Sequence, residues 1–264
     1  VQNITDPDIV PYIPDGIGNS TDRQRIPAVL IIPGGAFRRL VYNFEGEDVA
    51  KWLNSMGIAA FVLECRLPSD EHDNAEDVPL IDAMRAMRVI RGRAQEFGID
   101  EAKIGVRGFM AALLSTAYES DVYADYKYKD EYDKLSARPD FAVCSYPVIS
   151  IDDCIEAGKR YMSEEQVLER ISDGKAKILH KYNPDKLVRP DMPPVFICET
   201  DDDRTTLSEN SVGFYMAARK AGVSAELHIF RTGGHGYGCG DDFAQTGEWK
   251  VLFTKWIKSI GIIS

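Results

Sequence analysis

One histidine of this 264-residue chain lies between glycines, in the run Gly233-Gly234-His235-Gly236. Glycines on both sides leave the imidazole on a flexible loop, free to reach across a site. Imidazole exchanges protons near neutral pH and is the commonest general base in enzymes. The remaining histidines lie in polar stretches or within a predicted strand: His72, His180 and His228. His235 is therefore the candidate base.

Two further segments could work with that base. The run Thr200-Asp201-Asp202-Asp203 directly follows a strand predicted for Val195–Glu199. A carboxylate at the end of a strand can orient a catalytic histidine, although adjacent aspartates also suit a solvated turn or a helix N-cap. The run Pro33-Gly34-Gly35-Ala36-Phe37 follows a strand predicted for Ala28–Ile32. Its backbone N–H groups could face a developing oxyanion, and a plain tight turn is the alternative.

A nucleophile is missing from the place where it would be expected. Residues 104–112 indicate a buried strand, a sharp turn and a helix, and serine hydrolases of this arrangement carry G-x-S-x-G at the turn. Here Met110 has the serine position and Ala112 that of the last glycine. A thioether has no ionisable proton, so Met110 cannot form an acyl-enzyme. Ser115 lies more than a turn into the helix, and we expect its hydroxyl to miss the geometry of the turn.

Strand and helix signals alternate along the chain, which predicts an α/β fold with a mostly parallel central sheet and helices on both faces. Residues 1–26, rich in Pro, Asp, Gly and Asn, suggest an N-terminal arm, and residues 27–264 a single domain. The polar segment 150–191 suggests an insertion near the site, helical in pieces. The predicted strands are Ala28–Ile32, Ile58–Leu63, Ile104–Val106, Phe141–Tyr146, Val195–Glu199 and Ala225–Phe230, and the predicted helices are Glu47–Met56, Leu80–Phe97, Glu164–Arg170, Lys175–Lys181, Glu209–Ala221 and Thr246–Ile260.

Composition narrows the classes of partner. The net charge of −11 argues against nucleic acid and anionic membrane surfaces. No apolar run approaches the roughly 18 residues that a membrane span needs. We expect a cytoplasmic location, and a leader that has been removed is the alternative. The cysteines are odd in number and mostly lie in apolar runs, which favours buried hydrophobic residues over a disulfide framework. They are Cys65, Cys144, Cys154, Cys198 and Cys239.

Together these segments resemble the esterase branch of the α/β-hydrolase superfamily, specifically the bacterial acetyl-esterase and xylan-esterase-like group. The resemblance runs from about Pro27 to the C-terminus, and the order of elbow, acid and histidine is the triad order of this fold. The motifs that carry it are Ile32-Pro33-Gly34-Gly35-Ala36-Phe37, Asn54-Ser55-Met56-Gly57-Ile58-Ala59, Pro79 to Arg88, Phe97-Gly98-Ile99-Asp100, Glu209-Asn210-Ser211 and Ala225 to Gly236.

The resemblance implies hydrolysis of short acyl esters, often acetyl groups on sugars, with no cofactor and no metal. It implies Asp202 as the triad acid and His235 as the base. The backbone N–H groups expected in the oxyanion hole are those of Gly35, Ala36 and Ala111. The chain departs from the family pattern Gly-Phe-Ser-Ala-Gly-Gly-His at the elbow, where it has Gly108-Phe109-Met110-Ala111-Ala112-Leu113-Leu114. We expect a monomer or a homodimer.

Three hypotheses follow. The first is a degenerate esterase that still binds a small ester or an acylated sugar. The second retains activity by another route, in which His235 and Asp202 activate water or Cys239 replaces the serine. The third is a non-catalytic binding or scaffold protein, with segment 150–191 or the tyrosine-rich stretch Tyr118–Tyr132 as its contact surface.

Overall fold

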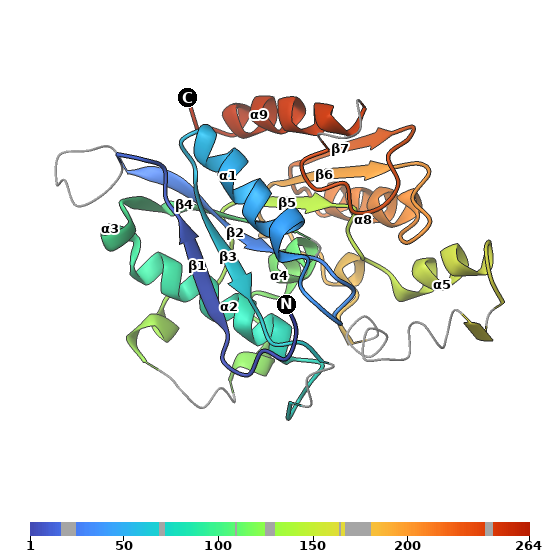
Figure 1. Ribbon diagram of the computed structural model, residues 1–264, viewed down its shortest axis with the longest axis horizontal. Coiled ribbons are helices and arrows are strands. Elements are labelled where there is room, and N and C mark those ends of the chain that lie inside the picture. The colour runs from blue at the N-terminus through green and yellow to red at the C-terminus, as the bar shows by residue number, and fades with distance from the viewer. Residues whose placement is uncertain are drawn as a thin grey trace.

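The computed structural model describes residues 1–16, 25–68, 72–108, 110–124, 130–163, 165–166, 181–240 and 245–264. Within these residues a seven-stranded sheet has the order β1-β3-β2-β4-β5-β6-β7 (Figure 1). Strands β2 to β7 pair in parallel, and β1 pairs with β3 in the antiparallel sense. The strands are β1 Asp8–Tyr12, β2 Ile26–Ile32, β3 Ala59–Glu64, β4 Ile99–Gly108, β5 Ala142–Ser145, β6 Val195–Thr200 and β7 Ala225–Phe230.

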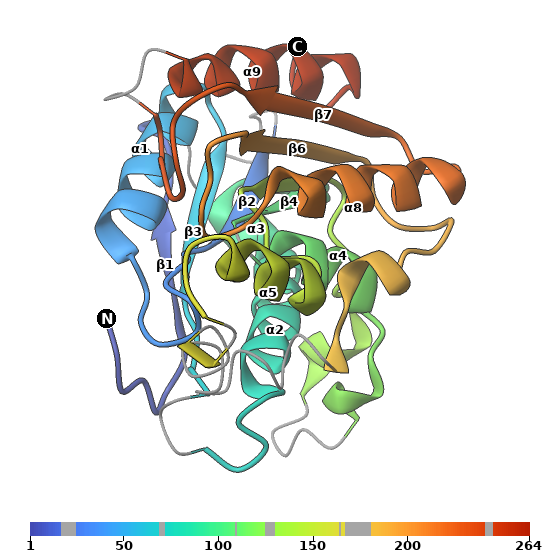
Figure 2. The same cartoon turned by 90° about the vertical axis from the view of Figure 1, so that its right-hand side faces the viewer.

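Helices cover both faces of this sheet (Figures 1 and 2). The apolar side chains of α1 and α9 join one buried cluster, and those of α2, α4 and α8 join another on the opposite face. This arrangement confirms the predicted α/β fold with a mostly parallel central sheet. The helices are α1 Asp48–Ser55, α2 Val78–Gly92, α3 Ala94–Phe97, α4 Ala111–Ala117, α5 Ile151–Lys159, α8 Ser208–Lys220 and α9 Trp249–Ser259, and the π-helix η1 spans Tyr42–Glu47.

Most predicted elements agree with the structure because their apolar patterns are unambiguous. The run Ile26–Ile32 is almost wholly buried, as expected for a parallel strand covered by helices on both faces. One predicted helix is wrong in detail: the pattern over Leu80–Phe97 forms two helices, α2 and α3. The backbone leaves the helical conformation at Arg93 (φ −99°, ψ 17°). The apolar period continues across this break because both helices pack on the same face of the sheet.

The N-terminal arm is a second correction. Residues 8–12 of the expected arm form β1 at the edge of the sheet, in register from Asp8 opposite Glu64 to Tyr12 opposite Ala60. Pro11 is compatible with this place because an edge strand leaves one row of N–H groups unpaired. The sequence signal is weak because a strand of five residues with only half-buried apolar side chains has no clear alternation.

The polar segment 150–191 contains α5 and a short 3₁₀ turn at Pro184–Lys186. The helices predicted for Glu164–Arg170 and Lys175–Lys181 fall largely outside the described residues. Four cysteines are buried as predicted, Cys65, Cys144, Cys198 and Cys239, and the side chain of Cys154 lies outside the described part. In the described residues, none of the helices combines the length and the apolar character required to cross a bilayer.

The parallel strands bring four chain segments to the same end of the sheet, the end at which the strands have their carboxyl termini. Strands β2, β4, β6 and β7 end at Ile32, Gly108, Thr200 and Phe230. In parallel sheets the loops beyond these carboxyl ends meet and form the usual ligand site. The glycine-rich loop, the elbow, the aspartate run and the histidine loop therefore all lie at the carboxyl end of the sheet.

The closest approach between β2 and β4 gives a testable prediction. Gly108 has φ +124°, and a Cβ placed on it would collide with the backbone carbonyl of Ile32. We expect Gly108→Ala to destabilise the protein by about 3 kcal/mol or more. Gly57→Ala is the matched control because Gly57 also has positive φ (+75°) but open space at its Cβ; its cost should be about 1 kcal/mol. Equal losses in urea unfolding would contradict this account.

Candidate active site

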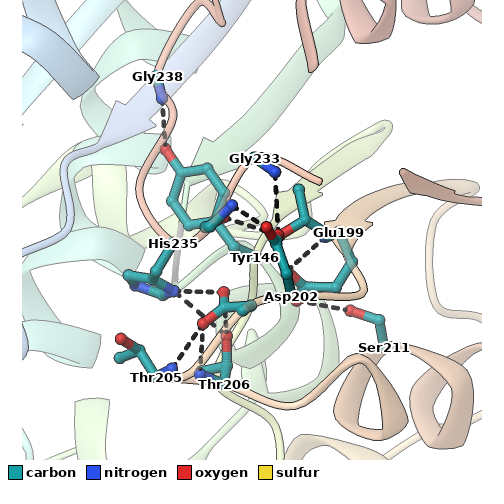
Figure 3. A network of polar contacts seen from close by, with 12 residues as sticks. Tyr146, Glu199, Asp202, Thr205, Thr206, Ser211, Gly233, His235 and Gly238 are labelled. Carbon is teal, nitrogen blue, oxygen red and sulfur yellow. Dashed lines mark hydrogen bonds and ion pairs between the residues drawn. The ribbon is translucent and has the colours of Figure 1, made fainter. Parts of the chain in front are cut away.

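His235 lies on the loop that follows β7, and that loop is fastened to the end of β6. The backbone N–H groups of Gly233 and Gly234 both donate to Oδ1 of Asp202, at 2.9 and 2.8 Å (Figure 3). Thr200 donates from Oγ1 to the carbonyl of Gly234 at 2.8 Å. These contacts fix the turn from which the imidazole projects.

Asp203, rather than the predicted Asp202, is the carboxylate that pairs with the histidine. Its Oδ2 lies 2.7 Å from Nδ1 of His235, and its side chain is wholly buried. The N–H groups of Thr205 and Thr206 donate to Oδ1 at 2.6 and 2.9 Å, and the Thr206 hydroxyl donates to Oδ2 at 3.1 Å. The prediction of Asp202 is wrong by one residue, because Asp202 accepts from the backbone N–H groups of Gly233 and Gly234 and leaves the imidazole to Asp203.

The state of this carboxylate follows from its partners. Burial alone would raise the pKa of Asp203, but the hydrogen bond from His235 and the N–H groups of Thr206 and Thr205 bring it below its usual value. An ionised carboxylate only accepts, so it holds the imidazole proton on Nδ1 and leaves Nε2 to act as a base. All the hydrogen bonds that His235 makes within the described part of the chain are at Nδ1, and its side chain is 32% exposed.

A second acid, Glu199, lies near the end of β6 and interacts with Asp203. It is wholly buried; the Thr200 N–H donates to its Oε1 at 2.9 Å and the Ser211 hydroxyl to its Oε2 at 3.3 Å. Burial, followed by the negative charge of Asp203, raises the pKa of Glu199 well above its usual value. The pKa values of these two neighbouring carboxyl groups are therefore shifted in opposite directions, lowered for Asp203 and raised for Glu199.

Tyr146 packs against the other side of the imidazole. The two rings meet edge to face with centroids 5.1 Å apart, and the Gly238 N–H donates to the tyrosine hydroxyl at 3.3 Å. Tyr146 is a non-glycine residue with positive φ (+38°), a strained conformation that is found disproportionately at functional sites.

The glycine-rich loop after β2 has three consecutive residues with positive φ. Gly35 has φ +136°, and the next two residues, Ala36 and Phe37, are both left-handed at +57° and +60°. The N–H groups of Gly35 and Ala36 have no acceptor among the described residues, and Ala36 is exposed. Free N–H groups on a strained loop suit a developing oxyanion.

At the elbow, Met110 has the backbone of an ordinary turn. It directly precedes α4 with φ −91° and ψ 4°, the values of the third residue of a type I turn. Its side chain is 2% exposed and belongs to the apolar cluster on the α2 and α4 face. Ala111, whose backbone N–H is expected in the oxyanion hole, is the first residue of α4. The preceding Phe109 lies outside the described residues.

Neither Ser115 nor Cys239 takes the place of a serine at the elbow. Ser115 is wholly buried, and its hydroxyl donates to the Ala111 carbonyl at 2.6 Å, so it faces back along α4. Cys239 is buried in the apolar cluster on the α1 and α9 face. The hydrogen bonds of His235 go to Asp203 and Thr206, not to the Cys239 sulfur.

The sequence relates this site to a known family: residues 17–217 match the BD-FAE family. The chain belongs to the BD-FAE family. It is 29% identical over 240 residues to an acetylxylan esterase of Xylanibacter ruminicola and 30% identical over 223 residues to an endo-1,4-beta-xylanase B of Butyrivibrio fibrisolvens. These matches cover 88% and 84% of this chain but 45% and 34% of the relatives, so the chain spans less than half of their length.

Solved structures place this BD-FAE chain among esterases. It is 36% identical to an acetyl ester-xyloside bifunctional hydrolase from Caldicellulosiruptor lactoaceticus, with a TM-score of 0.79 over 98% of this chain and 89% of that one. A carboxylesterase from Lactobacillus plantarum is 21% identical, with a TM-score of 0.77 over 97% and 94% of the two chains, which shows the shared fold alone. The expected esterase branch of the α/β-hydrolases is confirmed.

The opposite shifts of Asp203 and Glu199 predict opposite effects of pH on the stability of this BD-FAE chain. The lowered pKa of Asp203 means that the unfolded chain binds more protons below the ordinary value of 3.8, so this stabilisation is lost as pH falls through that region. Glu199, with a raised pKa, keeps its proton in the folded state above 4.5, so stability falls as pH rises.

Urea unfolding from pH 3 to pH 8 tests these signs. The free-energy difference between wild type and Asp203→Asn should shrink toward acid pH. The free energy of unfolding of wild type should fall relative to that of Glu199→Gln as the pH rises toward neutral. Asp202→Asn controls for placing an amide at this turn. Slopes of the same sign for the two variants would refute the assignment.

Proposed function

We propose that this chain binds a short acyl ester of a sugar, such as an acetylated xylo-oligosaccharide, and does not hydrolyse it by a serine triad. The proposal is carried by the contact between His235 and Asp203, by the N–H groups of Gly35 and Ala36, which have no acceptor among the described residues, and by the buried methionine at residue 110. The sugar ester is inferred from the acetylxylan esterase and the acetyl ester-xyloside hydrolase among its relatives.

Binding is supported by the parts of the site that do not need a nucleophile. The N–H groups of Gly35 and Ala36 would donate to an ester carbonyl, and the open Nε2 of His235 would contact a hydroxyl or the ester oxygen. Polar groups fixed in advance by buried partners favour binding because little ordering is needed when the ligand arrives.

The loss of kcat that follows removal of a serine nucleophile is known to order of magnitude. Removing the serine of such a triad costs about 10⁶ in kcat and leaves a residual from the oxyanion hole and binding. A second candidate function, water activation by His235 with Asp203 as its partner, is favoured by the partial exposure of the His235 side chain and by its Nε2, which makes no hydrogen bond within the described residues. It would give slow hydrolysis rather than a covalent intermediate.

Turnover of p-nitrophenyl acetate tests the absence of a triad. We expect wild type to react within about tenfold of free imidazole, since only one general base remains. Met110→Ser should regain less than about 10² of the missing 10⁶, because the side chain at residue 110 is buried in the apolar cluster on the α2 and α4 face and no contact joins it to His235 in the described residues. A fast wild-type reaction that His235→Ala abolishes would overturn the proposal. A slow reaction that His235→Ala and Asp203→Asn both remove would favour water activation.

Calorimetric titration with acetylated xylo-oligosaccharides tests the binding itself. We expect measurable affinity that falls roughly tenfold in His235→Ala, the loss of about one hydrogen bond to a polar ligand. The deacetylated oligosaccharides serve as the ligand control, since they lack the ester carbonyl. Binding that is equal for both ligands, or absent for both, would contradict an ester-binding site.

A further inference from the structure

We infer that Glu45 and Arg107 are positioning residues that hold the oxyanion loop and the histidine loop, residues 33–41 and 231–240, at a fixed separation. These loops follow β2 and β7, which are separated in the sheet by β4, β5 and β6. The inference extends the ligand site proposed above and rests on that proposal only for its binding measurement.

Arg107 is a buried cation directly before the elbow. It lies on β4 opposite Ile31 and Val143, and it is 2% exposed. Its Nη1 donates to the carbonyl of Glu45 at 3.1 Å, and its Nη2 to the carbonyl of Gly238 at 3.5 Å. Its guanidinium also lies 5.4 Å from the ring of Trp249.

The hydrogen-bond partners of the Arg107 guanidinium are backbone carbonyls. No carboxylate lies within ion-pair distance of its guanidinium in the described residues, so this buried charge depends on carbonyl oxygens. A carbonyl partner fixes main chain rather than a side chain. The two carbonyls belong to η1 and to the histidine loop, and Arg107 therefore ties two stretches of backbone together.

Glu45 extends this tie to the oxyanion loop. Its side chain is buried, and Oε2 accepts the Gly34 N–H at 2.8 Å. A Cβ on Gly236 would lie 3.6 Å from Oε1, so the same carboxylate lies against the residue that follows His235. Glu45 thus accepts from Arg107 with its main chain and from the oxyanion loop with its side chain.

The histidine loop continues the connection to the imidazole. Gly238 accepts from Arg107 with its carbonyl and donates from its N–H to the hydroxyl of Tyr146. Tyr146 packs edge to face on His235. A path of direct contacts therefore leads from Gly34 through Glu45, Arg107, Gly238 and Tyr146 to the imidazole.

Hydrogen exchange of the two loops, measured by mass spectrometry on the full chain, tests this inference. We expect Arg107→Met to speed exchange roughly tenfold in both loops, since it removes both bonds at once. Glu45→Leu should act on the oxyanion loop more than on the histidine loop, and Glu45→Gln should stay near wild type because its amide oxygen can still accept from Gly34.

Arg91→Met is the matched control. Arg91 also ties loops together, with bonds to the carbonyls of Glu101 and Arg138 and to Asp140. These partners lie near the amino ends of β4 and β5, whereas the His235 loop follows the carboxyl end of β7. Arg91→Met should lower the melting temperature without changing exchange in residues 33–41 and 231–240. If Arg107→Met does not fold, the comparison of Glu45→Leu with Glu45→Gln still tests the inference. Exchange that rises equally in Arg91→Met and Arg107→Met, or in only one loop of Arg107→Met, would overturn the inference.

The binding readout separates positioning from stability alone. Arg107→Met and Glu45→Leu should weaken binding of the acetylated oligosaccharide roughly tenfold, Glu45→Gln should restore it, and Arg91→Met should leave it unchanged. A wild type that binds no such ligand would refute the proposed function, while the exchange experiment would still test the tie between the loops.

Discussion

The carboxylate of Asp203 is charged and removed from water, and such a group is tolerated only where hydrogen bonds replace its solvation. Three N–H or O–H donors from residues 205 and 206 and the imidazole of His235 meet this need. The turn after β6 is built around the carboxylate, and the same turn places Asp202 where it holds the histidine loop. One buried charge thus accounts for the arrangement of both strand ends.

In the proposed function, the groups that would bind an ester are distinct from the group that would cleave it. Backbone donors at Gly35 and Ala36 and the pair of Asp203 and His235 depend on the fold and do not depend on residue 110. In the family pattern the nucleophile is a single side chain before α4. Met110 at this position is compatible with the fold because its side chain joins the apolar cluster on the α2 and α4 face. Under the proposed function, the reaction could be lost while the surroundings of the ligand are kept.

Much of the fold could be predicted from the sequence, because buried parallel strands such as Ile26–Ile32 have continuous apolar runs that few other structures produce. Strand β1 could not, because a short edge strand buries little and its pairing with β3 is a distant contact. His235 was accessible to sequence reasoning through its flanking glycines. The choice between Asp202 and Asp203 was not, since it depends on which way each side chain leaves a turn. Arg107 was missed as well, because an isolated arginine in a strand gives no sign of the carbonyls that it will meet.

The left-handed pair Ala36 and Phe37 has a consequence for how this protein could change. Each costs on the order of 1 kcal/mol relative to a glycine in the same conformation. Phe37 is buried in the apolar cluster on the α2 and α4 face, so packing offsets its cost, whereas Ala36 is exposed and gains nothing comparable. Selection for stability alone would therefore favour glycine at position 36, and an alanine kept there in the left-handed conformation is a cost that stability does not explain.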